Sequence, residues 1–434
     1  MVEGQESHNA HRIAPPPPAC GRRSPSPRAL GEDVDSHHLA PATAIRSTAG
    51  MPPAPLTGLK VVELARILAG PWAGQTLADL GAEVVKIESP AGDDTRTWGP
   101  PFVDNPDGTR DAAYFHACNR GKTSVVADFA DPDDLAAVKA LIADADVVIE
   151  NFKVGGLAKY GLDHASLAAT NPRLVSCSIT GFGQDGPYAP RAGYDFIVQG
   201  MSGIMDLTGE PGGQPQKIGV AFADIMTGLY AVIAIQAALA MRETTGRGQH
   251  IDLSLLDTMT GVLANQAMNF LTTGVSPTRV GNAHMNVCPY AVVPVADGWF
   301  ILAVGNDAQF RRFCGVVGLP ADDPCYASNA LRLQHRDPLF AEIEAATRTF
   351  AQADLLAKLE AAGVPAGPIN TVAQAFADPQ VVARGMRIDA RRPDGSTVPG
   401  VRTPIRFSDA GLSTDRAAPE LGQAASVSGA GLRA

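Results

Sequence analysis

A strand-like stretch, Lys60-Val-Val-Glu-Leu64, is followed by a helix-like segment from Ala73 to Leu80 and by a second strand-like stretch, Glu83-Val-Val-Lys-Ile-Glu88. Both stretches are short and rich in β-branched residues, which is typical of buried strands. Gly81 ends the segment between them, as glycine often ends a helix. Because a strand, a helix and a strand at this spacing form a parallel βαβ unit, the sequence predicts an α/β fold with a parallel sheet.

The same alternation continues along the chain. Strand-like runs at 123–127 and 145–151 enclose a helix that starts at Pro132, and a further strand at 173–180 precedes a helix from about Ile218 to Arg242. Near Leu256 the composition changes to the mixture of short helices and strands that is typical of a smaller α+β domain. We therefore expect a disordered extension (1–54), the first part of a large domain (55–255), a small α+β domain (256–362), a return to the large domain (363–420) and a loose tail (421–434).

The N-terminal extension differs in composition from the rest of the chain. It contains a run of prolines from Pro15 to Pro18 and lacks apolar periodicity, so it buries too little apolar surface to offset the entropy of ordering it. A transit peptide is a weaker interpretation, because such peptides are poor in acidic residues. A third interpretation is that translation begins at Met51.

Composition excludes several classes of function. The chain has 434 residues, 45% of them hydrophobic, and a formal net charge of −10 without a basic block, which argues against nucleic-acid binding and against an anionic membrane surface. Its six cysteines form no C-x-x-C pair and no spacing that suits zinc, so we expect no metal site and a cytoplasmic location with reduced thiols. The longest apolar run, Leu229 to Met241, is too short to span a bilayer and is expected to be a buried helix.

The strongest candidate for a reacting group is Asp195. It follows a glycine-rich loop that starts at Gly181, directly after the strand-like run that ends at Thr180, and ligands of open α/β sheets bind beyond the carboxyl ends of the strands. Turn chemistry alone favours a simpler role for an Asp in such a loop, as a turn or cap residue. Two other loops carry basic residues, Arg96 and Lys122, which are suited to phosphate but are more often simply solvated.

A series of ordered motifs between about residues 55 and 422 resembles the class III CoA-transferases, the formyl-CoA and carnitine CoA-transferase family. Within this family, the sequence most resembles the members that move CoA between dicarboxylic acids, of the succinyl-CoA:dicarboxylate type. The motifs are Leu68-Ala-Gly-Pro71, Leu77-Ala-Asp-Leu-Gly-Ala82, Gly92-Asp-Asp-Thr-Arg-Thr-Trp-Gly-Pro-Pro-Phe102, Asn119-Arg-Gly-Lys-Thr-Ser124, Asp146-Val-Val-Ile-Glu-Asn-Phe152, Thr180-Gly-Phe-Gly-Gln-Asp-Gly-Pro187, Gly193-Tyr-Asp195 and Asp378-Pro-Gln-Val381.

The resemblance implies an enzyme that moves CoA from an acyl-CoA, such as succinyl-CoA, to a free carboxylic acid. It makes Asp195 the nucleophile, which attacks the thioester to give an aspartyl anhydride and then an aspartyl-CoA thioester. Backbone N–H groups between Gly181 and Gly186 are candidate donors to the oxyanions that develop. Coenzyme A and acyl-CoA are substrates in this chemistry, and no metal or prosthetic group is called for.

The resemblance also implies residues that bind CoA, and a fold. Lys159 replaces an arginine of some members, and Ser89 replaces another, so Arg96 or Lys122 is expected to supply the missing phosphate contacts. The family's C-terminal histidine is absent after Leu421-Gly-Gln. The implied fold is an interlocked homodimer, whose Rossmann-like large domain has a parallel sheet built from both chain ends. The implied CoA contacts are Leu68, Ala69, Asn151, Phe152 and Lys159, besides Arg96 and Lys122.

Two other functions compete with CoA transfer. An α-methylacyl-CoA racemase would share the fold, but racemases of this family carry a Gly-His-Asp motif where this chain has Gly193-Tyr194-Asp195, and His164 is the only nearby imidazole. Tyrosine is a poor base near neutral pH. A non-catalytic CoA-binding protein is the second alternative, and it would be favoured if Asp195 were replaced. A Rossmann dehydrogenase is disfavoured, since the glycine fingerprint is absent.

Overall fold

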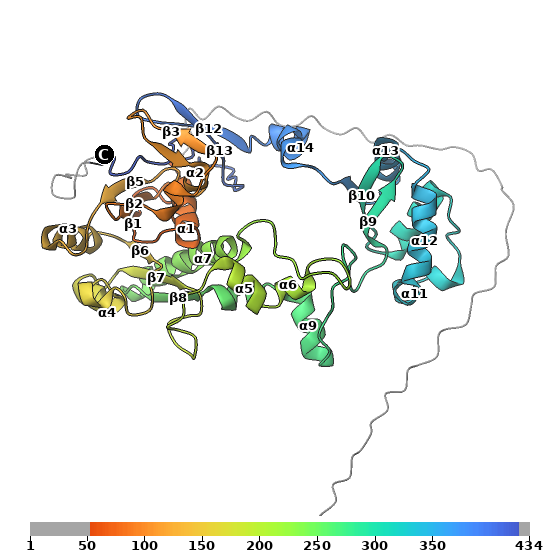
Figure 1. Cartoon of the computed structure of the whole chain (residues 1–434), viewed down its shortest axis with the longest axis horizontal. Coiled ribbons are helices and arrows are strands. Elements are labelled where there is room, and N and C mark those ends of the chain that lie inside the picture. Colours follow the sequence, from red (N-terminus) through yellow and green to blue (C-terminus); the bar gives the residue numbers. More distant parts are fainter. Residues whose placement is uncertain (1–52, 425–434) are drawn as a thin grey trace, which may run out of the picture. The chain divides into compact units, whose positions relative to one another are not determined.

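The computed structural model describes residues 53–424, which form two compact units (Figure 1). The large unit consists of residues 53–285 and 369–424, and the small unit consists of residues 286–368. The extension expected at 1–54 lies almost wholly outside the described residues, as does the tail from 425 onward. Each unit is described by itself below.

A six-stranded parallel sheet forms the centre of the large unit, and its order is β5-β2-β1-β6-β7-β8. This confirms the predicted α/β fold with a parallel sheet. The order reverses between β1 and β6, the place where ligands bind in open α/β sheets. The strands are β1 (Lys60–Glu63), β2 (Glu83–Glu88), β5 (Thr123–Val126), β6 (Val147–Glu150), β7 (Val175–Thr180) and β8 (His250–Ser254).

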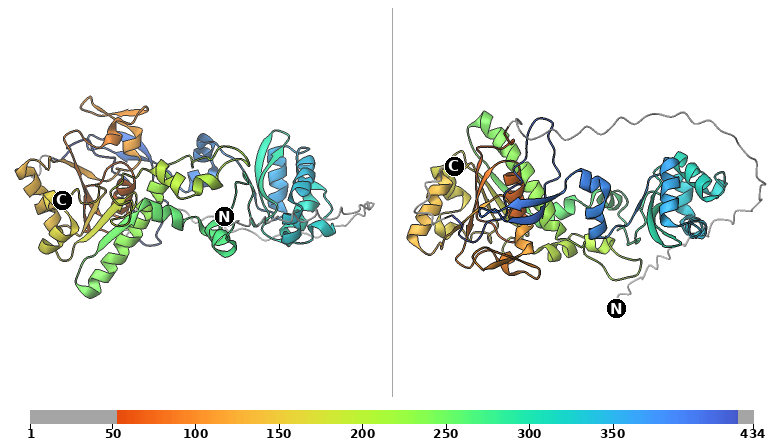
Figure 2. Two further views of the ribbon diagram at one scale, coloured as in Figure 1. Left: turned by 60° about the horizontal axis from the view of Figure 1, so that its bottom comes forward. Right: turned by 90° about the horizontal axis from the view of Figure 1, so that it is seen from above.

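Helices cover both faces of this sheet, and they can be followed by colour in Figure 2. Val61 of β1 packs with helices α1, α5, α7 and α8, whereas its neighbour Val62 packs with α3 and α4, because successive residues of a strand point to opposite faces. The helices are α1 (Ala69–Asp79), α3 (Pro132–Ala143), α4 (His164–Thr170), α5 (Asp195–Met201), α6 (Ile204–Leu207), α7 (Phe222–Thr245), α8 (Leu255–Gly261) and α9 (Ala264–Thr273).

Helix α7 (Phe222–Thr245) lies close to the predicted helix from about Ile218 to Arg242 and contains the apolar run Leu229 to Met241. Its 24 residues are long and apolar enough to cross a membrane, with a mean hydropathy of 1.6 in the most apolar window. However, Ala223, Ala231 and Ile235 on one side of α7 are buried in the core cluster that also contains α1 and the sheet. We therefore assign α7 to the core of the large unit, as expected for a buried helix.

The returning chain adds no strand to the large sheet. It forms short helices and a separate hairpin, so the expectation of a sheet built from both chain ends is wrong in this respect. The return is nevertheless bonded to the large unit, since Ser413 donates its N–H to Asp79 and Gly422 donates to Ser124 Oγ. Its elements are α14 (Val372–Ala377), α15 (Pro379–Ala383), β12 (Arg387–Arg391) and β13 (Thr397–Val401). A second hairpin, β3 (Phe102–Asp104) with β4 (Arg110–Ala112), precedes α2 (Ala113–His116).

The small unit has an antiparallel sheet with helices packed against it. It spans 286–368, whereas the sequence placed it at 256–362, because α8 packs on α5 and α7 of the large unit and β11 completes the small sheet. Its core contains Phe300, Phe313 and Leu355. Its elements are β9 (Tyr290–Val295), β10 (Gly298–Ala303), β11 (Ala366–Pro368), α10 (Asp307–Val317), α11 (Asn329–Gln334), α12 (Arg336–Thr347) and α13 (Gln352–Ala361).

Helix α1 approaches strand β1 so closely that only glycine fits at the contact. A Cβ added to Gly70 would lie 2.3 Å from Ala65 Cβ, and a Cβ added to Gly74 would lie 1.8 Å from Glu63 Oε2. Both glycines therefore serve the close packing of α1 against β1 and the residues that follow it.

We expect Gly74→Ala to lower the free energy of unfolding by about 1–3 kcal/mol, because the added methyl overpacks the contact with Glu63. Thermal and urea unfolding would measure the loss. Gly261→Ala in α8 is the matched control, since nothing lies within 4 Å of its added Cβ, and it should be neutral or slightly stabilising. Equal stability of the two variants would contradict the close contact.

Candidate active site

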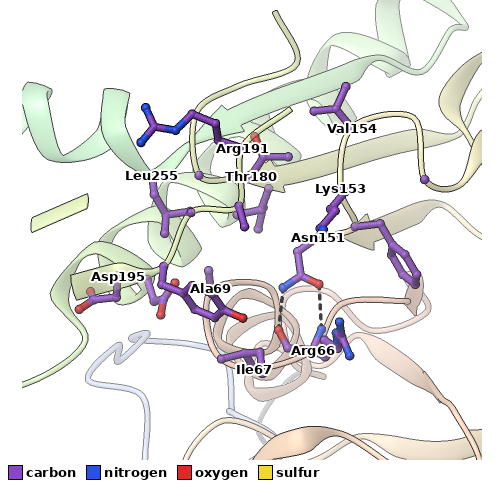
Figure 3. Close-up of a pocket in the computed structure, with 18 of the residues that line it drawn as sticks. Arg66, Ile67, Ala69, Asn151, Lys153, Val154, Thr180, Arg191, Asp195 and Leu255 are labelled. Carbon is purple, nitrogen blue, oxygen red and sulfur yellow. Dashed lines mark hydrogen bonds between the residues drawn. The ribbon is translucent and has the colours of Figure 1, made fainter. Parts of the chain in front are cut away.

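A cavity of about 430 Å³ lies at the carboxyl ends of β1, β6 and β7, where the strand order reverses (Figure 3). Loops that follow these strands supply most of its lining, and α7 and α8 add Asp224 and Leu255. The structure brings six sequence-predicted residues together here: Leu68, Ala69, Asn151, Phe152, Lys159 and Asp195.

Asn151 ties together the loops that follow β1 and β6. Its Oδ1 accepts the Arg66 N–H at 3.0 Å, and its Nδ2 donates to the Arg66 carbonyl at 2.7 Å, as the dashed lines in Figure 3 show. The neighbouring Phe152 N–H donates to Glu150 Oε2 at 2.7 Å. Burial raises the pKa of Glu150, and the hydrogen bonds from the Ser178 hydroxyl and the Phe152 N–H offset only part of this shift. Both sides of the cavity are therefore held by hydrogen bonds.

Arg96 does not reach the cavity. Its guanidinium is buried, with Nε and Nη2 donating to both oxygens of Glu88 at 2.9 and 2.8 Å and Nη1 donating to Asp111 at 2.9 Å. Burial opposes the charged form, but these carboxylates outweigh it and raise the pKa of Arg96. The expectation that Arg96 binds phosphate is therefore corrected, since its donors are already used within the fold.

Lys122 is likewise outside the cavity. Its Nζ is buried 2.8 Å from Glu63 Oε2 and donates to the Asn119 side chain at 2.8 Å and to the Pro71 carbonyl at 2.9 Å. Burial lowers the pKa of this ammonium, and the Glu63 carboxylate opposes that shift. The expectation of a phosphate contact is corrected here too, because Lys122 neutralises an internal carboxylate.

Sequence reasoning missed three basic residues that do line the cavity: Arg66, Lys153 and Arg191. Arg66 is exposed and pairs with Asp94 at 3.1 Å, and the Arg191 guanidinium lies 4.4 Å from the ring centroid of Tyr188. With Lys159 they give the cavity a positive rim. Arg66 and Lys153 stand just beyond the carboxyl ends of β1 and β6, and that position was the signal available in the sequence.

Asp195 is the first residue of α5, and both of its oxygens are engaged. Oδ1 accepts the N–H of Ala223 at 2.7 Å, and Oδ2 accepts from Gln199 Nε2 at 2.7 Å. Because Ala221 cannot cap α7, the Asp195 carboxylate satisfies one of the free N–H groups at the start of that helix. Asp195 therefore joins α5 to the start of α7 within the cavity.

Asp224 is a second carboxylate in the cavity, and the sequence analysis missed it. It lies in the first turn of α7, and no residue of the described chain donates a hydrogen bond to its carboxylate. Burial and then the nearby charge of Asp195 raise the pKa of Asp224 to about 7. The available signal was an acidic residue at the start of an otherwise apolar helix.

The glycine-rich loop closes on itself beside these carboxylates. A Cβ added to Gly181 would lie 2.4 Å from the Cα of Gly193, so both positions require glycine. Within the loop, the Gly183 N–H donates to Thr180 Oγ1 at 2.9 Å and the Gln184 N–H donates to Asp252 at 3.0 Å. These two expected oxyanion donors are therefore occupied by protein acceptors.

The structure does not support a racemase. His164 Nδ1 lies 2.7 Å from Ser176 Oγ, its ring stacks on His250 at 4.9 Å, and it does not line the cavity. No histidine is among the residues that line this cavity. Across the described residues, 53–424, no group of three or more His, Cys, Asp or Glu side chains could hold a metal ion.

Comparison with known proteins agrees with the family resemblance. The profile of CoA-transferase family III matches residues 56–425. The chain is 58% identical over 373 residues to the succinate–glutarate CoA-transferase of Agrobacterium fabrum, covering 85% of this chain and 93% of that protein. It is 39% identical over 372 residues to the succinyl-CoA:glutarate CoA-transferase of Homo sapiens, covering 85% of this chain and 84% of that protein.

Solved structures show the same architecture. A CAIB/BAIF family protein from Brucella suis is 63% identical, with a TM-score of 0.78, and the match covers 86% of this chain and 97% of that one. Rv3272 from M. tuberculosis is 29% identical, with a TM-score of 0.75, and the match covers 86% and 98% of the two chains.

The raised pKa of Asp224 leads to a stability prediction. The unfolded carboxyl ionises from about 3.8 and the folded one only at about 7, so wild-type stability falls as pH rises between these values and stays reduced above them. Asp224→Asn does not titrate, so it should melt above wild type at pH 8, with a difference that shrinks toward pH 4. Differential scanning fluorimetry across pH would measure this. A difference that does not depend on pH would contradict the assignment.

Proposed function

Because the chain belongs to CoA-transferase family III, we propose that it moves CoA from succinyl-CoA to a free dicarboxylic acid, with glutarate as the first acceptor to test. The chain is an enzyme, a CoA-transferase, and CoA thioesters are its substrates. The observation that carries the choice of acids is the 58% identity to the Agrobacterium fabrum protein over 85% of this chain.

The proposed reaction proceeds through a carboxylate of the enzyme. One carboxylate oxygen attacks the thioester carbonyl, the C–S bond breaks, and CoA leaves as a thiolate, which gives a mixed anhydride. The thiolate then attacks the enzyme's own carbonyl, so that the donor acid leaves and an enzyme–CoA thioester remains. The acceptor carboxylate repeats these steps in reverse and departs as its CoA thioester. No electrons or protons are gained or lost overall, so this chemistry requires no metal or prosthetic group.

Asp195 is the nucleophile that the family resemblance implies, and it lines the cavity. The bonds that its two oxygens accept from Gln199 and Ala223, both at 2.7 Å, fix the position of the carboxylate and leave lone pairs free for an attack on the thioester. Asp224, whose carboxylate lines the same cavity without a hydrogen bond from the described residues, is the second candidate.

The positive rim suits the phosphates of CoA. Lys159, Lys153, Arg66 and Arg191 line the cavity, while the chain as a whole carries a net charge of −10, so an anionic ligand must be attracted locally. We assign the phosphate contacts to these four residues in place of Arg96 and Lys122. Leu68, Ala69, Asn151 and Phe152 form the wall along which the rest of CoA would lie.

We also propose a homodimer in the cytoplasm. Helix α9 has no buried residue, and Leu271 on it is 71% exposed. Ile233, on the face of α7 turned away from the core, is 62% exposed. An apolar hollow of about 400 Å³ between α6, α8 and α9 adds to the uncovered surface. Apolar surface of this extent is typical of a face that a partner covers, and the family resemblance makes a second copy of this chain the partner. The cytoplasmic location is inferred from the four buried free thiols of the described chain, Cys118, Cys177, Cys288 and Cys314.

Replacing each carboxylate separately identifies the nucleophile. Asp195→Asn keeps an oxygen acceptor for Ala223, so it should fold and bind CoA, but it should lose transfer by several orders of magnitude, because the covalent route is gone. Asp224→Asn leaves that carboxylate in place and should lose less. The measurement is kcat/KM for glutaryl-CoA formation from succinyl-CoA.

A direct test traps the intermediate. Succinyl-CoA without an acceptor, followed by hydroxylamine, should leave a hydroxamate that mass spectrometry finds on the peptide containing Asp195. A hydroxamate on Asp224 would instead identify that carboxylate as the nucleophile, and modification of Cys177 alone would exclude both carboxylates.

Size-exclusion chromatography with light scattering tests the dimer. Wild type should elute with twice the 45.1 kDa mass of the chain. Leu271→Glu combined with Ile233→Glu should weaken the association, because it places charges in an apolar contact. Ala136→Glu on α3, an exposed position on the opposite side of the sheet, is the control and should leave the mass unchanged. A monomeric wild type would refute the dimer.

A further inference from the structure

Ile67 has a backbone conformation that its residue type disfavours. Its φ is 72°, in the left-handed region, and the other non-glycine residue with positive φ in the described chain is Ala264. A β-branched side chain at positive φ is an outlier, because its Cβ crowds the following carbonyl. Ile67 lines the cavity and joins β1 to α1, so this strained residue lies at the site.

Buried side chains hold this turn in place. The Ile67 N–H is directed at the Asp93 carboxylate, 3.3 and 3.2 Å from its two oxygens, and the Ile67 carbonyl accepts a weak bond from Cys118 Sγ at 3.6 Å. The backbone N–H and carbonyl of the preceding residue, Arg66, are both hydrogen-bonded to the Asn151 side chain. The turn is thus clamped from two sides by residues that are far away in the sequence.

Asp93 is itself rigidly placed. It is 2% exposed, and its carboxylate lies 2.9 Å from Lys86 Nζ while accepting the N–H and hydroxyl of Thr95 at 3.0 and 2.8 Å. Lys86 Nζ also donates to Glu63 and to the Ala65 carbonyl. Burial opposes ionisation of Asp93, but the Lys86 charge outweighs it and lowers the pKa of Asp93, so the clamp is a carboxylate at neutral pH.

Helix α1 depends on this turn for its starting position. Its N-cap residue is Leu68, which supplies no capping side chain, so no side-chain bond of the cap residue fixes where the helix begins. Leu68 and Ala69 line the cavity directly after the turn. A relaxed Ile67 would return to negative φ and move these two residues.

We propose that Asp93 is a positioning residue, which holds Ile67 in the left-handed conformation so that Leu68 and Ala69 meet bound CoA. The proposal rests on the proposed function only in placing CoA in this cavity. It does not depend on which carboxylate attacks or which acid accepts CoA. Asp93 touches no substrate in this scheme and acts through the backbone of Ile67.

The test compares the effect of Asp93→Ala in three backgrounds: wild type, Ile67→Gly and Ile67→Ala. Calorimetric Kd for CoA is the readout, and melting temperature is measured beside it. In wild type, loss of Asp93 should weaken CoA binding on the order of tenfold, the size expected for strain at one left-handed residue. In the Ile67→Gly background it should weaken binding less than about threefold, because glycine adopts positive φ without a clamp.

Ile67→Ala is the matched control, since alanine also loses the isoleucine side chain but keeps the Cβ that disfavours positive φ. There the loss should stay near tenfold. A loss that is equal in the glycine and alanine backgrounds, or unchanged CoA affinity in Asp93→Ala, would overturn the proposal. If Asp93→Ala does not fold, Asp93→Asn serves in the same comparison, because it keeps the size of the side chain while removing its charge. Absence of transfer by wild type would count against the proposed function and leave this comparison valid.

Discussion

The reversal of strand order between β1 and β6 is the constraint on which the rest of the site depends. The sheet continues through β2 on one side and through β7 on the other, so the loops that leave β1 and β6 diverge and a crevice opens between them. Asn151 bonds these two loops to each other through Arg66 and so sets their separation. The cavity is therefore a consequence of topology, and the individual side chains decide only its chemistry.

Some basic side chains near the site are paired with carboxylates in the interior, and others lie at the cavity rim. Arg96 and Lys122 come from loops, but carboxylates on neighbouring strands, Glu88 and Glu63, neutralise them below the surface. Breaking such a buried pair leaves an uncompensated charge, so these residues serve the fold. Lys153 and Arg191 have no carboxylate partner within the described chain, and they remain available to an anionic ligand.

The sequence was sufficient for the parts of the structure that depend on local pattern. β-branched runs located the strands, and the position of the glycine-rich loop beyond a strand end placed Asp195 at the cavity. The other five cavity residues, Leu68, Ala69, Asn151, Phe152 and Lys159, came from the family resemblance. The sequence was insufficient where a partner lies far along the chain. The engagement of Asp195 depends on Ala223, and the burial of Arg96 depends on Asp111, and no local pattern reveals either contact. The left-handed Ile67 was equally hidden, because isoleucine gives no sign of positive φ.

The start of α7 shows how one helix end gives two aspartates different properties. Asp195 reaches it from α5 and accepts the Ala223 N–H, so the positive end of the helix dipole stabilises the Asp195 charge. Asp224 lies one residue further on, where the same dipole should favour its ionised form, yet burial and the charge of Asp195 raise its pKa to about 7. The charge that fixes the helix is thus also a cause of the neighbour's raised pKa. Two carboxylates at one helix end therefore have different environments, because one accepts hydrogen bonds at both oxygens and the other is buried beside its charge without one.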